Sequence, residues 1–265
     1  MPSLSNLPIH PYGVVLALAF VAGIGLGLWN GRRLGYSTDR ILDLAVWFLL
    51  SAMIGARALY IVLYPSQFPT VGSWFAITQG GLVFFGGFLA TAVTVIGYGR
   101  WHGLSLRDLG DLIAPCLMLG HAIGRVGCFL NGCCYGRPTD LPWGVVFPRL
   151  GDGLPRHPTQ LYEAGFLLAL FFLAQWLFRR RVEKKWGFPG AIWGSYTLAY
   201  SLFRFAIEYV RGDDRGGFFT PAMLSISQGI SLAGVVASLA WLHLCRRKHH
   251  QESATRKGAS DEPTG

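Results

Sequence analysis

Charged residues are scarce in this chain, and acidic residues are fewer than basic ones. Asp, Glu, Lys and Arg make up 14% of the 265 residues, whereas hydrophobic residues make up 52%. A soluble domain has about 25% charged residues. Several apolar runs also reach about 20 residues, the length that a helix needs to cross a bilayer. The composition therefore excludes a soluble globular domain and predicts an all-α, polytopic membrane protein.

Three catalytic signatures are missing as well. The chain contains no HExxH, no Gly-rich P-loop and no GxSxG. Zinc protease, nucleotide hydrolase and serine hydrolase functions therefore lose their usual support in the sequence. We also find no internal repeat, a feature that secondary transporters commonly show.

The first apolar run has no Lys or Arg before it, and Arg32 and Arg33 follow it. A secretory signal has the opposite order. We therefore expect this run to remain as a transmembrane helix with the N-terminus outside. In all we expect seven spans, at residues 12–30, 41–63, 81–99, 109–130, 159–178, 187–210 and 221–244.

Basic residues are distributed unevenly among the connections. With the N-terminus outside, the odd-numbered connections and the C-terminal segment are cytoplasmic, and they contain 15 of the 23 Lys and Arg residues. This is the positive-inside pattern, so the net charge of +9 gives little support to nucleic-acid binding. We expect a single transmembrane domain over 1–245, with an extracytoplasmic loop at 131–158, and a disordered cytoplasmic tail over 246–265.

Arg125 and Arg204 lie inside predicted spans. A guanidinium at the centre of a bilayer costs about 2.5–3.5 kcal/mol on insertion scales, so an intramembrane arginine suggests a functional site. Glu208 and Arg211 follow Arg204 at helical spacing, which predicts that all three share one face and that Glu208 orients both arginines. In the expected topology, all four residues lie near the outer ends of their spans.

Converging arginines at this depth suit the phosphate of an anionic lipid, because the planar guanidinium pairs with phosphate oxygens and keeps its charge when partly dehydrated. Gly120, Gly124 and Gly127 flank Arg125 and allow another helix or a ligand to come close. The alternative is structural. Glu208 would then only neutralise its neighbours, and Arg125 would extend to water.

Three blocks of sequence resemble a known family. HAIGRVGCFLNGCCYGR (121–137), LPRHPTQLYEA (154–164) and FRFAIEYVRGDD (203–214) are similar to the signature blocks of the phosphatidylglycerol–prolipoprotein diacylglyceryl transferases. The resemblance extends from HPYG at the start to the seventh predicted span, and it implies a bacterial inner-membrane enzyme that acts at the outer leaflet. The implied reaction moves the diacylglyceryl group of phosphatidylglycerol to the lipobox cysteine of a prolipoprotein, which forms a thioether and releases glycerol phosphate. No metal or organic cofactor is implied.

The resemblance also implies roles for individual residues. Arg125 and Arg204 match two essential arginines of the family, and Glu208 and Arg211 match the acidic and basic residues that follow the second. The implied catalytic residues are Arg125, Arg204, His157 and Glu208, and the implied substrate-binding residues are Arg125, Tyr12, Asn131, Gly136, Arg204 and Arg211.

The group that accepts the thiol proton is open, because Phe85 stands where better-known members have a histidine. His121, one turn before Arg125, is one candidate. His157 is a second candidate, since the resemblance reaches it. Glu208 is a third, although flanking arginines make it a weak base.

Five cysteines are present, and three of them follow closely on one another. Cys128 and Cys133 stand where Asn and Glu are common in the family, and Cys134 follows. These three cysteines have three interpretations: a redox centre, a metal site, or small apolar side chains that fill gaps in the packing. We favour the last, because no fourth metal ligand is evident. The sequence predicts that Cys116 is buried within its span and that Cys245 is a thiol at the inner surface of the membrane.

Two other classes of function remain open. A carrier or flippase for an anionic lipid or solute would use Arg125 and Arg204 and would have to expose them to both sides of the membrane. A membrane thiol oxidoreductase would depend on the three clustered cysteines and would be inactivated by their alkylation. A diverged paralogue without transferase activity is a further possibility.

Overall fold

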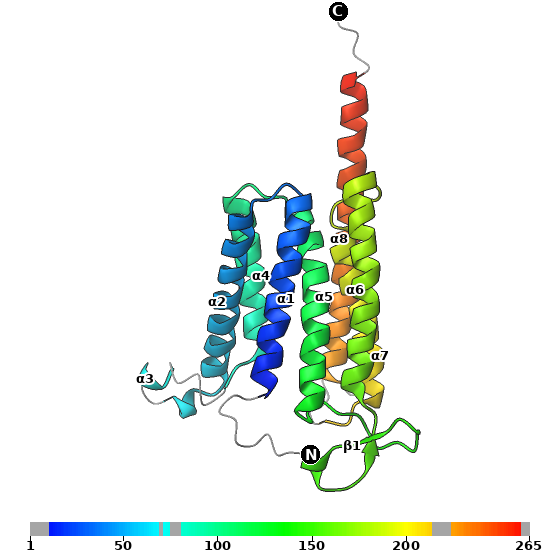
Figure 1. Ribbon diagram of the computed structural model, residues 1–265. Coiled ribbons are helices and arrows are strands. Elements are labelled where there is room, and N and C mark those ends of the chain that lie inside the picture. The colour runs from blue at the N-terminus through cyan, green and yellow to red at the C-terminus, as the bar shows by residue number, and fades with distance from the viewer. Residues whose placement is uncertain (1–10, 69–70, 75–80, 214–223, 261–265) are drawn as a thin grey trace, which may run out of the picture. The chain divides into compact units, whose positions relative to one another are not determined.

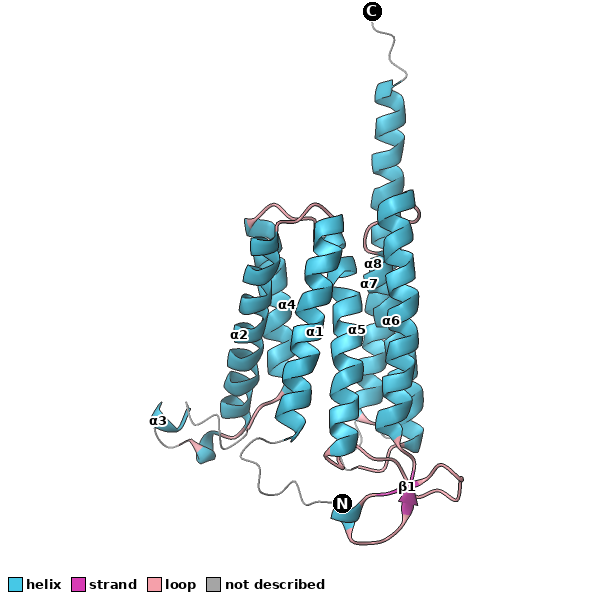
Figure 2. Ribbon diagram, viewed as in Figure 1, coloured by secondary structure: helices cyan, strands magenta, loops and turns pink. Residues whose placement is uncertain are grey.

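The computed structural model describes residues 11–68, 71–74, 81–213 and 224–260, and most of them are helical (Figure 1). The long helices are α1 (Pro11–Arg33), α2 (Thr38–Leu63), α4 (Phe84–Trp101), α5 (Leu106–Leu130), α6 (Thr159–Lys184), α7 (Ala191–Ile207) and α8 (Ile226–Ser260). The short elements are α3 (Val71–Trp74), the 3-10 turns η2 (Pro65–Gln67), η4 (Pro148–Leu150) and η5 (Glu208–Val210), and the antiparallel strands β1 (Val145–Val146) and β2 (Pro155–Arg156). Figure 2 shows α3 and β1 among the long helices and loops.

Each predicted span overlaps one long helix. Five of these helices, α1, α2, α5, α6 and α8, are long and apolar enough to cross a membrane, so the chain is a multi-pass helical membrane protein. The other two are shorter, with 18 residues in α4 and 17 in α7. Residues 1–10 and the first three residues of the predicted span at 221–244 lie outside the described part of the chain.

The expected disorder of the tail differs from the structure. Helix α8 continues to Ser260, so residues 246–260 are helical, and the rest of the tail, 261–265, lies outside the described residues. The helical part reads RRKHHQESATRKGAS, which contains several strong helix formers and no proline. Because adding residues to an existing helix is far easier than starting one, the apolar helix propagates into this polar segment.

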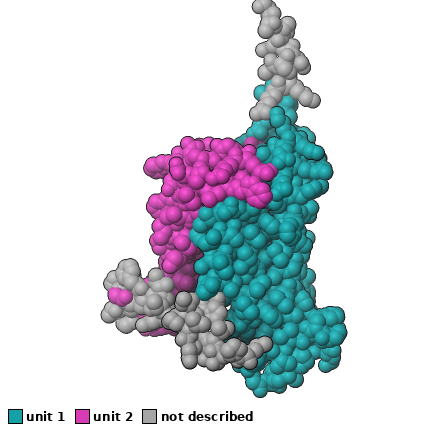
Figure 3. Space-filling view, in the orientation of Figure 1, with its two compact units in different colours: residues 1–27, 110–265 teal, residues 28–109 magenta. Residues whose placement is uncertain are grey.

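The long helices form two compact units (Figure 3). The smaller unit comprises residues 28–109, and the larger comprises 1–27 and 110–265. In the smaller unit, α2 and α4 approach closely through glycines: a Cβ added to Gly55 would lie 2.4 Å from both the Cβ of Ala90 and the carbonyl oxygen of Gly86. Small residues thus bring the two backbones together, as is common between membrane helices.

In the larger unit, α5, α6, α7 and α8 lie side by side (Figure 1). Asp111 on α5 holds the start of α7, because its buried carboxylate accepts hydrogen bonds from the backbone N–H groups of Gly190 at 2.8 Å and Trp193 at 2.9 Å. The same carboxylate lies 3.0 Å from the guanidinium of Arg181 on α6. The first N–H groups of a helix need acceptors from outside it, so Asp111 caps α7 from a neighbouring helix.

We expect Asp111→Asn to lower the free energy of unfolding by about 1–3 kcal/mol, since a buried donor left without its acceptor costs that much. Asp140→Asn, at an exposed loop position, is the control and should change it by less than about 0.5 kcal/mol. Chemical unfolding in detergent, followed by tryptophan fluorescence, measures both. Equal stability of the two variants would contradict the capping role.

Candidate active site

A buried carboxylate, Glu163, lies at the centre of a charged cluster in the larger unit. It belongs to the second turn of α6, and its side chain is 0% exposed. Its Oε1 lies 2.9 Å from Arg125 NH2 and 3.3 Å from His121 Nε2, and it accepts the hydroxyl of Tyr200 at 2.8 Å. Its Oε2 lies 4.0 Å from Arg211 NH1. One carboxylate therefore collects groups from α5, from α7 and from the segment after η5.

Glu163 is absent from the residues predicted for the site. A signal for it exists in the sequence, because Glu163 lies inside the predicted span at 159–178. An acidic residue in a span suggests a functional site by the same rule that applies to an arginine. Applied to both signs of charge in the predicted spans, that rule selects Glu163 together with Asp43, Arg57, Asp111, Arg125, Arg204 and Glu208.

Arg125 faces the protein interior and does not extend to water, since its side chain is only 14% exposed. Helix α1 packs on the glycine face of α5. A Cβ on Gly127 would lie 3.0 Å from Val15 and 3.4 Å from the Tyr12 ring, and one on Gly120 would lie 3.5 Å from a backbone oxygen of α1. The expectation that these glycines admit another helix is thus confirmed at Gly120 and Gly127, where it brings Tyr12 onto α5, but a Cβ on Gly124 would meet no atom within 4 Å.

Arg204 and Glu208 form the second charged group, and their predicted pairing one turn apart is confirmed, with NH1 2.5 Å from Oε2. The start of α8 supports both side chains. Arg204 NH2 donates to the hydroxyl of Ser227 at 2.9 Å, and the hydroxyl of Ser225 donates to Glu208 Oε1 at 2.7 Å. This ion pair is therefore held between the end of α7 and the start of α8.

Arg211 does not share the helical face of Arg204, so this part of the prediction is wrong. Helix α7 ends at Ile207, and after η5 the backbone of Arg211 is extended and forms a β-bridge with Gly136. The Arg211 guanidinium donates two hydrogen bonds to Asp213, at 2.9 Å and 2.8 Å, where the sequence predicts Glu208 as the partner. The β-bridge to Gly136, which is distant in the chain, holds Arg211 in an extended conformation beyond the end of the helix.

The guanidinium of Arg211 stays charged in this place. Burial lowers the pKa of Arg211, but the hydrogen bonds and the negative charge of Asp213 more than offset this, so the pKa is raised overall. An arginine is protonated at physiological pH even without such help. Arg211 therefore supplies a permanent positive charge beside Glu163.

Gly136, predicted to bind substrate, lies where three segments meet. Its N–H donates to the carbonyl of His157 at 2.9 Å, and the N–H of Arg137 donates to the carbonyl of Val210 at 2.8 Å. A Cβ on Gly136 would lie 2.5 Å from the Cβ of His157 and 2.8 Å from the carbonyl oxygen of Val210. Only glycine fits this junction, which aligns the loop with the segment that carries Arg211.

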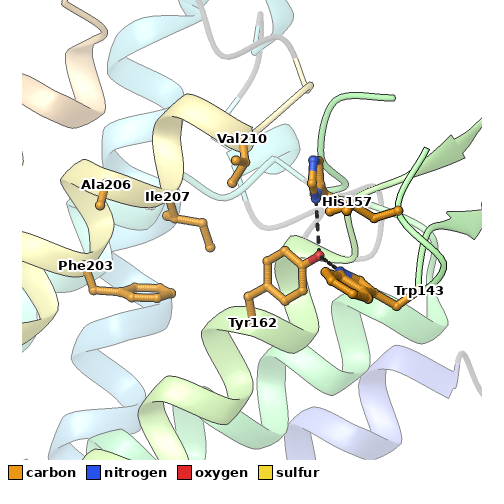
Figure 4. Close-up of a pocket in the computed structure, with 8 residues that line it drawn as sticks. Trp143, His157, Tyr162, Phe203, Ala206, Ile207 and Val210 are labelled. Atoms are coloured by element: carbon orange, nitrogen blue, oxygen red, sulfur yellow. Dashed lines mark hydrogen bonds between the residues drawn. The ribbon is translucent and has the colours of Figure 1, made fainter. Parts of the chain in front are cut away.

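His157 and Tyr162 lie at the polar edge of a cavity of about 490 Å³ (Figure 4). His157 Nδ1 lies 3.2 Å from the hydroxyl of Tyr162, which also accepts a hydrogen bond from the Trp143 indole at 2.7 Å. The remaining lining is apolar and consists of Leu141, Phe203, Ala206, Ile207 and Val210. His157 thus faces this cavity, whereas His121 contacts Glu163.

The predicted substrate-binding residue Asn131 and Phe85, which stands where the family has a histidine, have different surroundings. Asn131 accepts the Arg149 guanidinium at its backbone oxygen, at 2.8 Å, and at its side-chain oxygen, at 3.0 Å, so its contacts order the loop after α5. Phe85 belongs to α4 in the smaller unit, where its ring packs edge-on against Phe84.

Comparison with known proteins gives a consistent result. The family model described as prolipoprotein diacylglyceryl transferase matches residues 1–244. Relatives named phosphatidylglycerol–prolipoprotein diacylglyceryl transferase include a protein of Solidesulfovibrio magneticus, 38% identical over 95% of both chains. Others are a protein of Cupriavidus necator, 33% identical over 96% of this chain and 94% of the relative, and one of Legionella pneumophila, 32% identical over 92% and 95%. The chain therefore belongs to the prolipoprotein diacylglyceryl transferase family.

Proposed function

We propose that the protein transfers the diacylglyceryl group of phosphatidylglycerol to the lipobox cysteine thiol of a prolipoprotein, the first step of lipoprotein maturation. Its family and the names of its relatives support this activity. The structural observation that carries the proposal is the state of Arg125. One of its terminal nitrogens is bound to Glu163, while its buried Nε has no hydrogen-bond partner among the described residues. A charged N–H that lacks an acceptor in these largely buried surroundings suits a phosphate oxygen.

We further propose that all seven long helices cross the bacterial inner membrane, with the N-terminus outside and the C-terminus inside. Helices of about 17–25 residues are long enough to span, so α4 and α7 qualify by length. The basic residues at the end of α6 and in the distal part of α8 favour a cytoplasmic location for those ends. In this topology the charged cluster faces the outer leaflet, and the loop over 131–158 covers it from outside.

The reaction that we propose is a displacement at carbon. The thiolate sulfur attacks the glycerol carbon that bears the phosphate, a sulfur–carbon bond forms, and the carbon–oxygen bond breaks. The electron pair of the broken bond stays on the oxygen of the departing glycerol phosphate. Arg125 would stabilise that growing negative charge, and Arg204 and Arg211 would add positive potential from fixed positions. The carboxylates of Glu163 and Glu208 hold these guanidinium groups in place.

We propose His121 as the acceptor of the thiol proton. Its side chain is 30% exposed, and its Nε2 lies 3.3 Å from the Glu163 carboxylate, which stabilises the imidazolium that proton transfer creates. The other candidates are less well arranged. His157 contacts the neutral hydroxyl of Tyr162, and Glu208 is already bound by Arg204 and Ser225.

To test this function, purified protein is incubated with phosphatidylglycerol vesicles and a lipobox peptide, and the mass of the peptide is measured by mass spectrometry. We expect a diacylglyceryl adduct on the peptide cysteine. Arg125→Ala should lower the rate by about 10²–10³-fold, as expected for removal of a donor that stabilises transition-state charge. Arg107→Ala, near the other end of α5, is the control and should retain the wild-type rate.

Failure to form the adduct would overturn the proposal if a relative from the same family is active in the same assay. The same preparation would then be tested for movement of fluorescent anionic lipid across vesicle bilayers. Movement that depends on Arg125 would identify a carrier, and no movement would favour a paralogue without either activity.

The role of His121 has its own test. We expect His121→Gln to lower the transfer rate by about 10²-fold, the low end of the usual contribution of a general base. The rate of this variant should recover as the pH rises, because thiolate then forms without a base. His243→Gln on α8 is the control. Full activity of His121→Ala at neutral pH, with Arg125→Ala inactive, would contradict the assignment.

A further inference from the structure

Three thiols converge at the end of α5. The Sγ atoms of Cys128, Cys133 and Cys134 all lie within 4.8 Å of one another, and each residue is half-buried. Sulfur atoms about 2.3 Å from one tetrahedral zinc ion lie roughly 3.8 Å apart. Small changes of side-chain angle would therefore bring all three thiolates onto a single ion.

The backbone folds the second and third thiols back toward the first. Gly132 has a φ of +68°, its N–H donates to the carbonyl of Phe129 at 3.0 Å, and the N–H of Cys133 donates to the carbonyl of Cys128 at 3.1 Å. This pair of bonds is the Schellman motif of a helix end. Cys134 then has a φ of +64°, a conformation that residues other than glycine rarely adopt.

The start of α6 holds this unusual backbone in place. Gln160 Nε2 donates to the carbonyl of Cys133 at 2.6 Å, and Thr159 Oγ1 donates to the carbonyl of Cys134 at 2.7 Å. Gln160 is 1% exposed, and its Oε1 has no hydrogen-bond partner among the described residues. A buried carboxamide oxygen without a donor is uncommon and requires an explanation. Here it belongs to the same amide group that supports the cysteine turn.

Two arginines lie close to the thiols along the chain and in the fold. Arg125 lies one turn before Cys128 on α5, and the backbone of Arg211 forms a β-bridge with Gly136, two residues after Cys134. Three thiolates around one divalent ion carry a net charge of −1, which complements these two positive charges.

We propose that Cys128, Cys133 and Cys134 form a binding site for one soft divalent cation, of which Zn²⁺ is the representative, with the Gln160 carboxamide oxygen beside it. Sulfur ligands select such ions over Mg²⁺ and Ca²⁺. The bound ion would be structural, since it would tie the last turn of α5 to the loop that leads to Gly136. The site does not depend on transferase activity. It also replaces our expectation from the sequence that these cysteines only fill gaps.

A metal-retention experiment tests the site. The full chain is purified in detergent with reductant, stripped with a chelator, loaded with zinc sulfate and desalted, and its zinc content is measured by mass spectrometry. We expect about one zinc ion per chain, a stoichiometry set by the three convergent sulfurs. Each of the substitutions Cys128→Ser, Cys133→Ser and Cys134→Ser should weaken zinc binding by at least about tenfold, since even outer contacts of metal sites have effects of that size. Cys116→Ser, earlier on α5, is the matched control and should bind zinc like the wild type.

A second measurement uses only the wild-type chain, so it stands even if the serine variants fail to fold. Zinc should protect Cys128, Cys133 and Cys134 from alkylation and leave the reaction of Cys116 and Cys245 unchanged, as peptide mapping would show. The proposal is overturned if zinc leaves the alkylation of the three unchanged. It is also overturned if two of them form a disulfide in protein purified without reductant, which peptide mapping identifies by the loss of two hydrogens.

Discussion

Glu163→Gln is expected to lower the free energy of unfolding by about 3–5 kcal/mol, the usual effect of removing one partner from a buried ion pair. The amide keeps the size of the side chain but removes the negative charge that Arg125 and Arg211 share. We also expect at least a 10²-fold loss of transfer rate, because the guanidinium groups would no longer be held in position. Chemical unfolding in detergent measures the first effect, and the lipobox-peptide assay at low temperature, where the variant is folded, measures the second.

Glu183→Gln on the same helix is the matched control. Glu183 is exposed, so its substitution should change the free energy of unfolding by less than about 0.5 kcal/mol. A double-mutant cycle with Arg125→Met measures the coupling between the two residues. The double variant should lose clearly less unfolding free energy than the two single variants lose when their losses are added. Simple additivity would mean that Glu163 does not support Arg125.

Gly136→Val is expected to abolish activity by displacing the segment that carries Arg211. Even a single added carbon would lie under 3 Å from both His157 and the carbonyl oxygen of Val210, so the backbones must separate. Overpacking of this kind costs about 1–3 kcal/mol. Because the displaced segment carries Arg211, the loss of transfer rate should exceed what the loss of stability explains. The peptide assay and chemical unfolding, carried out on the same preparation, distinguish the two effects.

Gly165→Ala is the control for this substitution. Gly165 lies within α6, and an added Cβ would meet no atom within 4 Å. Alanine is the better helix former by about 0.5–1 kcal/mol, so stability should rise slightly and activity should be retained. An active Gly136→Val variant would show that Arg211 is placed by its own contacts and not by this junction.

The helices could be predicted because membrane spans are governed by local rules. Every backbone group in the apolar layer must be paired within its own helix, so length and apolar content are enough to find a span. Beyond the apolar layer, this rule no longer predicts where a helix ends. The continuation of α8 to Ser260 follows from the helix-forming character of a polar segment, which a count of apolar residues does not register.

The same division explains the results at the charged site. The pairing of Arg204 with Glu208 was accessible because the two residues are one helical turn apart. The position of Arg211 could not be predicted from the sequence, because it depends on a β-bridge to Gly136 in a different loop. The contacts of Glu163 likewise come from other helices and cannot be read from spacing along one chain segment.

The pairing of Arg125 with Glu163 also bears on how the chain enters the membrane during synthesis. Each residue alone would carry an unpaired charge into the lipid, and for an arginine this costs about 2.5–3.5 kcal/mol on insertion scales. The two residues belong to consecutive long helices, α5 and α6, and lie 2.9 Å apart in the finished structure. Insertion of α5 and α6 together as a hairpin would allow the charges to neutralise each other before α7 is made. The ion pair that organises the site would then also assist the assembly of the helices around it.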